Sequence, residues 1–421
     1  MTFPLRVSEN KRYLVDSLGA PFFLSGDSPW EISWQLTADD AALYLEARHQ
    51  QGFNAILVDA IPYTEWSDHL TQGNCSRHAP FRTPGDFSTP NDAYFDELER
   101  LVDVAASKGM LVLLSVADLG ATVINHPEWN ARGGMWHTQY LANGPHTMGA
   151  YARYLGTRFR THPNIIWVVG GDRDPYGVFW HVDEMARGLR DTAPDRLITY
   201  HAGAKSSGLF FQDQPWFDIN MAYGYRDPHI FVADKYRRQP VKPTFLGESG
   251  YEGETLDGRG GSSQRMRRQA YWSILSGACG HFYGSAAWTM TPIWREWLNA
   301  PGSAHMSYVA TFFRSFEWHR LIPDYGQSVI VDGYESGSTL ATTATIPDGS
   351  LAISYLPTPR RVLVDLSRFK GPVQARWFDP TTGDEKPVAG SPFTNSGSHA
   401  MTPPEKNAAG DGDVVLVLSV A

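Results

Sequence analysis

The sequence contains few of the residues that define several common protein classes. Two cysteines, Cys75 and Cys279, occur in 421 residues, too few for a disulfide scaffold or for a zinc site with four cysteine ligands. No apolar run reaches the roughly 18 residues that a membrane-spanning helix requires. The N-terminus shows no charged-then-apolar leader pattern. We therefore expect a cytoplasmic protein that does not insert into membranes, and a secreted or periplasmic protein whose leader was removed is the alternative.

Basic clusters and several well-known catalytic motifs are also missing. The net charge is −9 and Lys and Arg form no blocks, which argues against nucleic acid and anionic membranes as partners. The chain has no phosphate-binding Gly-x-x-x-x-Gly-Lys loop, no Gly-x-Ser-x-Gly elbow and no His-Glu-x-x-His pattern. These absences argue against nucleotide hydrolysis, serine α/β-hydrolase chemistry and zinc proteolysis.

Aromatic residues, in contrast, are abundant, with 14 Trp, 19 Tyr and 21 Phe. Many of them belong to the core that a chain with 42% hydrophobic residues can build. Trp and Tyr also stack on the C–H faces of sugar rings, while their N–H and O–H groups reach hydroxyls. Composition therefore slightly favours a carbohydrate as the substrate.

Short apolar stretches alternate with helical periodicity over the first three quarters of the chain. One helical face carries Phe95, Leu98 and Leu101 at turn spacing. The apolar stretches do not alternate with polar residues, as is typical of parallel strands buried on both faces. Eight such units predict an α/β fold, a (β/α)8 TIM barrel over residues 1–325 that opens with a short β-hairpin. An open, doubly wound sheet is the alternative. The expected strands cover 21–25, 53–58, 110–116, 164–169, 197–201, 217–221, 243–247 and 280–284.

The pattern changes near residue 326, where helical periodicity stops. Short β-rich runs follow, such as Leu351–Tyr355 and Val414–Leu418, and turn signals such as Asp348-Gly349 separate them. We expect residues 326–421 to form a small, all-β sandwich domain.

Catalytic groups of such barrels lie just after the C-terminal ends of the strands. Asp172 follows the fourth expected strand through two glycines, and Glu248 follows the seventh. This spacing places the two carboxylates across the barrel mouth from each other, as glycoside hydrolysis requires. Asp172 could instead cap a helix or pair with Arg173, and Glu248 could form a structural ion pair.

Other polar and aromatic residues at strand ends are candidates for contacts with substrate hydroxyls. His201 lacks a second His or Cys at ligand spacing, so we expect neither a metal nor a cofactor. A structural role for His201 is the alternative, and loop Asp and Asn often cap turns. The predicted substrate-binding residues are Asp27, Trp30, Asp59, Tyr200, His201, Asn220, Tyr223, Tyr283 and Trp288.

Five segments of the expected barrel and one of the expected β domain form a distinctive set. They are Phe23–Trp30, Gly52–Ile56, Trp167–Asp172, Tyr200–His201, Gly247–Glu252 and Ala375–Gly383. As a set, the barrel segments resemble the apiosidase-like glycoside hydrolases, glycoside hydrolase family 140. The tail with Ala375–Gly383 is similar to the small β domain that follows the barrel in that family, which carries the label "putative collagen-binding".

The resemblance implies a retaining hydrolase in which Asp172 matches the acid/base and Glu248 the nucleophile. It implies apiose, or a related pentofuranose on a plant oligosaccharide or glycoside, as the sugar released. A retaining pair should lie roughly 5–5.5 Å apart, with the pKa of Asp172 raised and that of Glu248 lowered. A non-catalytic sugar-binding protein, a glycosidase for another sugar, and an inverting hydrolase with its pair roughly 6.5–9.5 Å apart are the alternatives.

Overall fold

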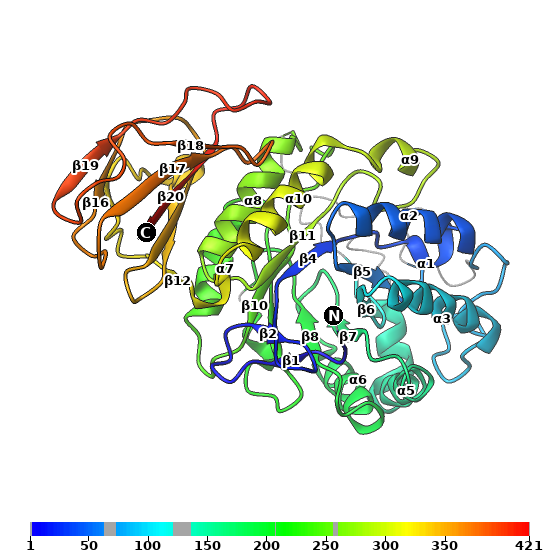
Figure 1. Cartoon of the computed structure of the whole chain (residues 1–421). Helices are drawn as coiled ribbons and strands as arrows, with labels where there is room; N and C mark the ends of the chain where they lie inside the picture. Colours follow the sequence, from blue (N-terminus) through cyan, green and yellow to red (C-terminus); the bar gives the residue numbers. More distant parts are fainter. Residues whose placement is uncertain (1, 63–72, 121–135, 207, 256–259, 421) are drawn as a thin grey trace.

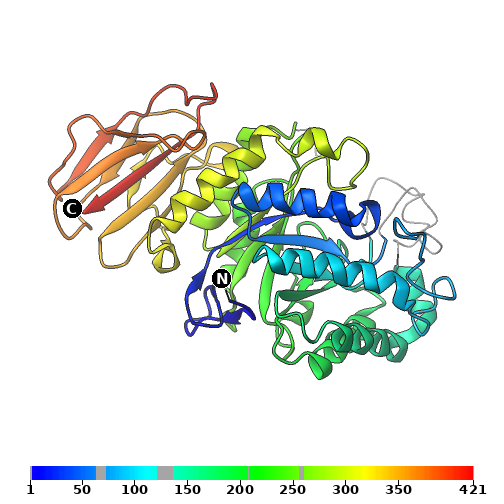
Figure 2. The ribbon, with the colours of Figure 1, turned by 45° about the vertical axis from the view of Figure 1, so that its right-hand side comes forward.

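A computed structural model describes residues 2–62, 73–120, 136–206, 208–255 and 260–420. In them the chain forms a barrel surrounded by helices, with a β domain at one side (Figures 1 and 2). No helix in these ranges is long and apolar enough to cross a membrane.

The barrel is a closed ring of eight strands, and every neighbouring pair is parallel. The predicted TIM barrel is thereby confirmed, and the open sheet is excluded. The strands are buried along their length because helices cover the outer face and side chains fill the interior. They are β4 (Leu24–Asp27), β5 (Ala55–Asp59), β6 (Leu111–Ser115), β7 (Ile165–Gly170), β8 (Ile198–His201), β9 (Ile219–Tyr223), β10 (Thr244–Glu248) and β11 (Gly280–Tyr283).

Helices follow most of these strands and begin at the residues that local chemistry favours. The hydroxyl of Thr37 accepts a hydrogen bond from the amide of Asp40, which caps the first long helix. The last long helix starts at Pro301, which suits a first helical turn, and ends at Arg314. The helices are α1 (Ile32–Gln35), α2 (Ala38–Gln50), α3 (Asp92–Ser107), α5 (His137–Arg158), α6 (Phe179–Thr192), α7 (Pro228–Tyr236), α8 (Ser263–Leu275), α9 (Trp294–Trp297) and α10 (Pro301–Arg314).

The N-terminal residues form a small antiparallel sheet where the barrel strands begin. It contains β1 (Arg6–Val7), β2 (Leu14–Val15) and β3 (Pro21–Phe22). The predicted hairpin corresponds to β2 and β3, and β1 adds a third strand beside β2. The chain passes from β3 almost directly into the first barrel strand.

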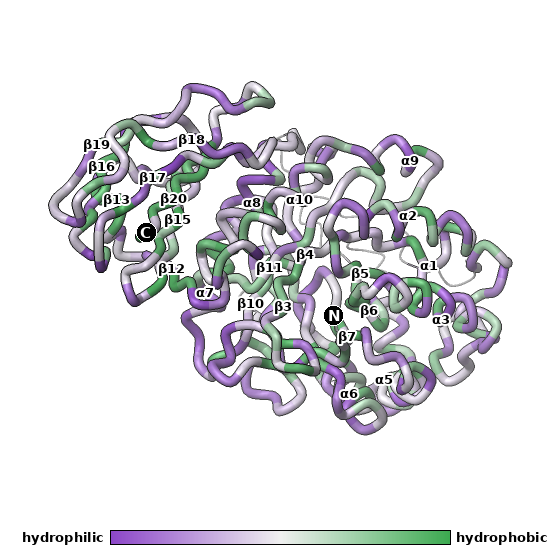
Figure 3. The backbone as a smooth tube through the Cα atoms, in the orientation of Figure 1, coloured by the Kyte–Doolittle hydropathy of each residue, from purple (hydrophilic) through white to green (hydrophobic). Residues whose placement is uncertain are grey.

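The C-terminal domain consists of a six-stranded and a three-stranded antiparallel sheet, as expected for a β sandwich. Its first strand, β12 at Ile322–Pro323, pairs with β14, so this sheet begins before the predicted boundary at residue 326. Figure 3 shows hydrophobic residues along the central strands β15 and β20. The other strands are β13 (Ile330–Asp332), β14 (Thr342–Thr345), β15 (Leu351–Leu356), β16 (Val362–Asp365), β17 (Val373–Phe378), β18 (Glu385–Pro387), β19 (Ser398–Met401) and β20 (Val414–Val420).

The β domain packs firmly against the barrel helices α8 and α10. Tyr271 of α8 stacks on Tyr355 of β15, with ring centroids 4.9 Å apart and planes 2° from parallel. Arg267 donates to both carboxylate oxygens of Asp413, at 2.8 and 2.7 Å, and both side chains are fully buried. Because a buried ion pair and stacked rings join the two domains, we expect them to behave as one rigid unit.

Replacing Arg267 by alanine should destabilise the protein strongly. The variant leaves the Asp413 carboxylate buried without its cation, which typically costs about 3–5 kcal/mol. This loss of stability should lower the urea concentration at the midpoint of unfolding, and the two domains should unfold in separate transitions. Arg320→Ala is the matched control, because its pair with Asp348 also links the two parts but is exposed to solvent. Equal unfolding midpoints for the two variants would contradict this account of the interface.

Candidate active site

Asp172 and Glu248 meet at the C-terminal mouth of the barrel. One oxygen of each carboxylate and one ring nitrogen of His201 all lie within 4.8 Å of one another. Glu248 is the last residue of β10, His201 is the last residue of β8, and Asp172 lies two residues beyond β7. The fold therefore brings together two carboxylates that are 76 positions apart in the sequence.

A β-bulge turns Glu248 into the barrel. Successive strand residues point to opposite sides, and Leu246 packs in the outer layer with Ala222. Regular alternation would therefore also point Glu248 outward. The register shifts between Leu246 and Glu248, so that Glu248 pairs with Tyr223, an inward-facing residue. A bulge re-aims a side chain in this way, and here it delivers the carboxylate to the pocket.

A sharp turn with positive φ angles brings Asp172 back over the barrel mouth. Gly170, Gly171 and Asp172 have φ values of 89°, 121° and 49°. A Cβ atom on Gly171 would lie 2.2–2.5 Å from the carboxyl group of Asp118, so glycine alone fits there. Asp tolerates the left-handed region better than most residues. The turn therefore depends on the Gly-Gly-Asp sequence that follows β7.

Glu248 is held by one side chain on each side, and Trp30 contacts both of these neighbours. The hydroxyl of Tyr251 donates to its Oε1 at 2.9 Å, and the indole of Trp30 donates to that hydroxyl at 2.7 Å. On the other side, Nε2 of His201 lies 3.1 Å from Oε2. The Trp30 ring stacks on His201, with centroids 5.7 Å apart. These contacts leave the carboxylate few rotamers.

Asp172 is held by His201 and by a tyrosine pair. Its backbone N–H donates to Nδ1 of His201 at 3.4 Å, so the histidine bridges the two carboxyl-bearing residues. The hydroxyl of Tyr223 lies near the Asp172 carboxylate and opposes the rise of its pKa. The hydroxyls of Tyr223 and Tyr225 lie 2.9 Å apart.

Burial raises the pKa of both carboxyls and so favours their neutral forms. Burial and the charge of Glu248 raise the pKa of Asp172 to about 6. Burial raises the pKa of Glu248 to about 8, against the opposing hydrogen bond from Tyr251. The prediction of a lowered pKa for Glu248 is therefore wrong. Its histidine neighbour does not supply a positive charge, because burial lowers the pKa of His201 to about 4.

Two further carboxyls, Asp59 and Asp118, lie near this pair. Asp59 ends β5, and in the described part of the chain its Oδ1 has no hydrogen-bond partner. Burial raises the pKa of Asp59, and the charges of Glu31 and Glu248 add to the shift. Asp118 accepts a hydrogen bond from the amide of Gly120, and its Oδ2 lies 4.0 Å from Nδ1 of His201. The pocket is thus rich in hydrogen-bond acceptors.

Four of the predicted substrate-binding residues lie beside the Asp172–Glu248 pair: Trp30, Asp59, His201 and Tyr223. Trp288 follows β11 and donates through Nε1 to Glu254 at 2.6 Å. Burial raises the pKa of Glu254 to about 7, against the opposing hydrogen bond from Trp288, and the charge of Glu248 adds to the rise. We therefore place Trp288 and Glu254 at the rim of the pocket.

Four other predicted substrate-binding residues point away from the pocket, contrary to expectation. Asp27 accepts from Arg48 at 2.8 Å, on the helix side of β4. The strand partner of Asp27, Tyr283, faces the same outer layer and donates to Glu252. Tyr200 donates to the carbonyl oxygen of Arg173 at 3.0 Å and packs on Phe211 outside the barrel.

The fourth is Asn220, which shares the outer face of β9 with Ala222. Alternation along a strand sends every second side chain outward. A position at the end of a strand therefore does not by itself place a residue in the site.

Two tyrosines of the site were not predicted. Tyr251 contacts Glu248 directly, and Tyr225 contacts Tyr223 beside the pair. Both follow a strand-end residue of the site within three positions, Tyr251 after Glu248 and Tyr225 after Tyr223. An aromatic hydroxyl at this short distance beyond a strand-end residue is the sequence signal that could have identified them.

Asp172, His201 and Glu248 also form a group of mixed oxygen and nitrogen ligands that could hold a divalent ion. Tyrosine hydroxyls already lie at these carboxylates, Tyr251 at Glu248 and Tyr223 at Asp172, so the arrangement does not require a metal ion. The arrangement is suited to proton transfer and nucleophilic attack at an acetal carbon.

Structures of glycoside hydrolases have the same overall fold. One, described as a glycoside hydrolase, has a TM-score of 0.85 and 24% identity, covering 99% of this chain and 97% of that chain. A glycoside hydrolase family 5 structure from Bacteroides vulgatus ATCC 8482 has a TM-score of 0.84 and 22% identity, covering 99% and 93%. No curated protein matches the sequence.

Two family models cover nearly the whole chain. Residues 322–419 match the "Putative collagen-binding domain of a collagenase", a description that corresponds to the β domain. Residues 8–320 match the model "Apiosidase-like, catalytic domain", which corresponds to the barrel with its carboxylate pair. The chain therefore belongs to the apiosidase-like family of glycoside hydrolases.

Proposed function

We propose that the protein is a retaining glycoside hydrolase that releases a terminal sugar from a plant oligosaccharide or glycoside. The observation that carries the mechanism is the separation of the pair, because oxygens of Asp172 and Glu248 lie within 4.8 Å of each other. Retaining enzymes hold their carboxyls roughly 5–5.5 Å apart, whereas inverting enzymes need roughly 6.5–9.5 Å to admit a water. The short separation supports the retaining assignment.

In the first step, an oxygen of Glu248 attacks the anomeric carbon and the bond to the leaving oxygen breaks. Asp172 gives its proton to that oxygen, and a covalent glycosyl-enzyme results. In the second step, Asp172 takes a proton from water, whose oxygen attacks the anomeric carbon. Glu248 then leaves as a carboxylate, with Tyr251 donating to it.

The sugar we propose is apiose or a related pentofuranose. The support is the match of residues 8–320 to the apiosidase-like catalytic domain. The free Oδ1 of buried Asp59 and the ring of Trp30 provide an acceptor for a hydroxyl and an apolar wall beside the pair. These are the groups that we expect to contact the sugar.

The direct test is a panel of aryl glycosides and plant glycosides that includes apiosides and other pentosides. We expect turnover of a pentofuranoside, with proton NMR showing that the first product keeps the anomeric configuration of the substrate. A first product of opposite configuration would refute the retaining mechanism. Selective turnover of a hexopyranoside would refute the sugar assignment, and sugar binding without turnover would identify a binding protein.

The activity should show a bell-shaped pH dependence with its maximum between about pH 6 and pH 8, the pKa values of Asp172 and Glu248. The reaction needs one proton on the pair. Below this range both carboxyls are protonated and the nucleophile is lost. Above it both are ionised and the acid is lost. The measurement is kcat/KM, which reports the free enzyme.

Tyr251→Phe should move the alkaline limb of this profile to higher pH. The hydroxyl of Tyr251 lowers the pKa of Glu248, so its removal lets burial raise that pKa further. Tyr44→Phe is the control, because that tyrosine contacts Asp27 and Arg48 outside the barrel. An unchanged alkaline limb in Tyr251→Phe would show that Glu248 does not titrate there.

A further inference from the structure

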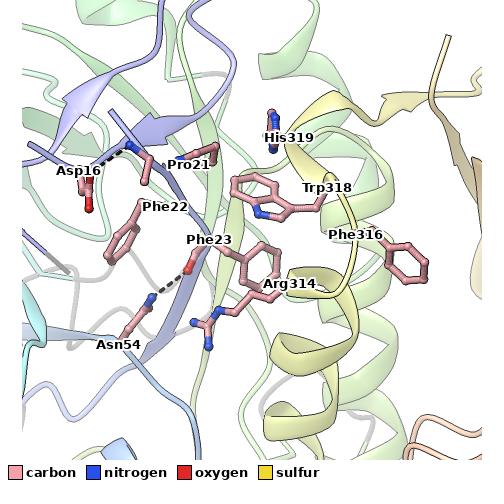
Figure 4. Close-up of a pocket in the computed structure, with 10 residues that line it drawn as sticks. Asp16, Pro21, Phe22, Phe23, Asn54, Arg314, Phe316, Trp318 and His319 are labelled. Carbon is pink, nitrogen blue, oxygen red and sulfur yellow. Dashed lines mark hydrogen bonds between the residues drawn. The ribbon is translucent and has the colours of Figure 1, made fainter. Parts of the chain in front are cut away.

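A cavity of about 420 Å³ lies at the end of the barrel where the strands begin (Figure 4). Phe23 and Asn54, which line it, immediately precede β4 and β5. The catalytic pair follows strand ends, so the cavity is at the opposite side of the barrel. Its volume falls within the roughly 300–1,000 Å³ typical of small-molecule sites.

The hydrogen-bond acceptors in the cavity wall are already engaged within the protein. Asp16 accepts from the amides of Leu18 and Ala20, both at 3.0 Å, and from the hydroxyl of Thr2 at 3.1 Å. The amide oxygen of Asn54 accepts from the amide of Ser25 at 2.9 Å. An incoming ligand therefore finds few acceptors in the wall.

The donors in the wall, in contrast, are unengaged. Within the described residues, neither the Arg314 guanidinium nor Nε1 of Trp318 has a hydrogen-bond acceptor, and Arg314 has no ion-pair partner. The Arg314 side chain is exposed to solvent and lines the cavity, so it lies at the opening, and its guanidinium lies 5.8 Å from the centroid of the Phe23 ring. An unpaired cation beside an aromatic wall favours a negatively charged ligand.

The remaining walls are apolar and flat. Phe22, Phe23 and Trp318 are almost fully buried and line the cavity together with Phe316. Figure 4 shows the indole of Trp318 and the guanidinium of Arg314 on either side of the Phe23 ring. A guanidinium binds a carboxylate through two parallel hydrogen bonds, and aromatic walls accommodate a ring.

We propose that this cavity binds a small organic acid in which a carboxylate is attached to a ring. The carboxylate pairs with Arg314, and the ring lies against Trp318. Aromatic acids and uronic acids share this chemistry. The cavity also contacts the turn before β12, so an occupant would brace the link between barrel and β domain.

The competing explanation is that Arg314 needs no ligand. It is the last residue of α10, where a cation is stabilised by the negative end of the helix dipole. Such a role predicts no affinity for organic acids, and a binding experiment separates the two explanations.

The test is calorimetric titration of the whole protein with benzoate, glucuronate and the neutral analogue benzamide. We expect saturable binding of at least one of the two acids and at least roughly tenfold weaker binding of benzamide, because a charged hydrogen bond is lost. Arg314→Gln should weaken acid binding by a similar factor without changing turnover. Arg320→Gln, on the neighbouring turn, should bind as the wild type does.

Asp172→Asn should also bind the acid normally, which distinguishes this cavity from the catalytic pocket. A stronger response to benzoate identifies aromatic acids as the class, and a stronger response to glucuronate identifies uronic acids. Equal affinity for benzoate and benzamide, unchanged binding by Arg314→Gln, or no saturable binding of either acid would overturn the proposal.

Discussion

Glu248→Gln is expected to lower kcat by roughly 10⁵-fold, the order of loss seen when a covalent nucleophile is removed. The amide keeps the size of the side chain and can still face Tyr251 and His201. It cannot form a glycosyl ester of comparable reactivity, so chemistry should fail while substrate binding survives. The measurement is turnover of an aryl glycoside, together with the dissociation constant of the same substrate.

Asp172→Asn separates the two roles. A substrate with a good leaving group needs little help from an acid, so its first step should be almost unaffected and the glycosyl-enzyme should accumulate. A substrate with a poor leaving group should lose roughly 10²–10⁴-fold in rate, the usual contribution of a general acid. Azide should restore turnover of the activated substrate and yield a glycosyl azide of retained configuration. A retained azide from Glu248→Gln instead would mean that the two roles are exchanged.

Gly171→Ala is expected to reduce kcat/KM by about 100-fold or more, because an error of about 1 Å in a catalytic group can cost that much. The new methyl group would lie 2.2 Å from the Asp118 carboxyl, and φ at this position is +121°. The turn must therefore shift and carry Asp172 away from Glu248. The measurements are kcat/KM and the unfolding temperature.

Gly177→Ala is the matched control for this prediction. Gly177 also has a positive φ, of +78°, but nothing lies within 4 Å of a Cβ atom there. The control should lose about 1–2 kcal/mol of stability from the left-handed conformation alone and keep its activity. Full activity in Gly171→Ala would show that the tight turn does not position Asp172.

The architecture and the meeting of Asp172 and Glu248 at one end of the barrel could be predicted from local sequence. Eight apolar stretches separated by helical periodicity specify a parallel barrel, because strands buried on both faces carry no polar alternation. Parallel strands of a barrel end at one face, so Asp172 and Glu248 had to share that face. This argument requires only the order and spacing of the elements.

The direction of each strand-end side chain was decided by the tertiary structure. Asp59 and His201 at strand ends face the pocket. Four residues at comparable strand positions face the helices instead, because side chains alternate along a strand: Asp27, Tyr200, Asn220 and Tyr283. A one-residue bulge reverses that alternation for Glu248. Register and bulges depend on pairing between strands distant in sequence, and local patterns do not encode them.

The electrostatic environment of the pair also depends on the whole fold. The roles assigned to Asp172 and Glu248 predicted opposite pKa shifts, but burial raises both. The sequence by itself determined the barrel, the β domain and the placing of two carboxylates at one end of the barrel. The tertiary structure decided which side chains contact the pair and how strongly the two carboxyls are desolvated. Desolvation depends on all the atoms packed around a group, and these come from distant parts of the sequence.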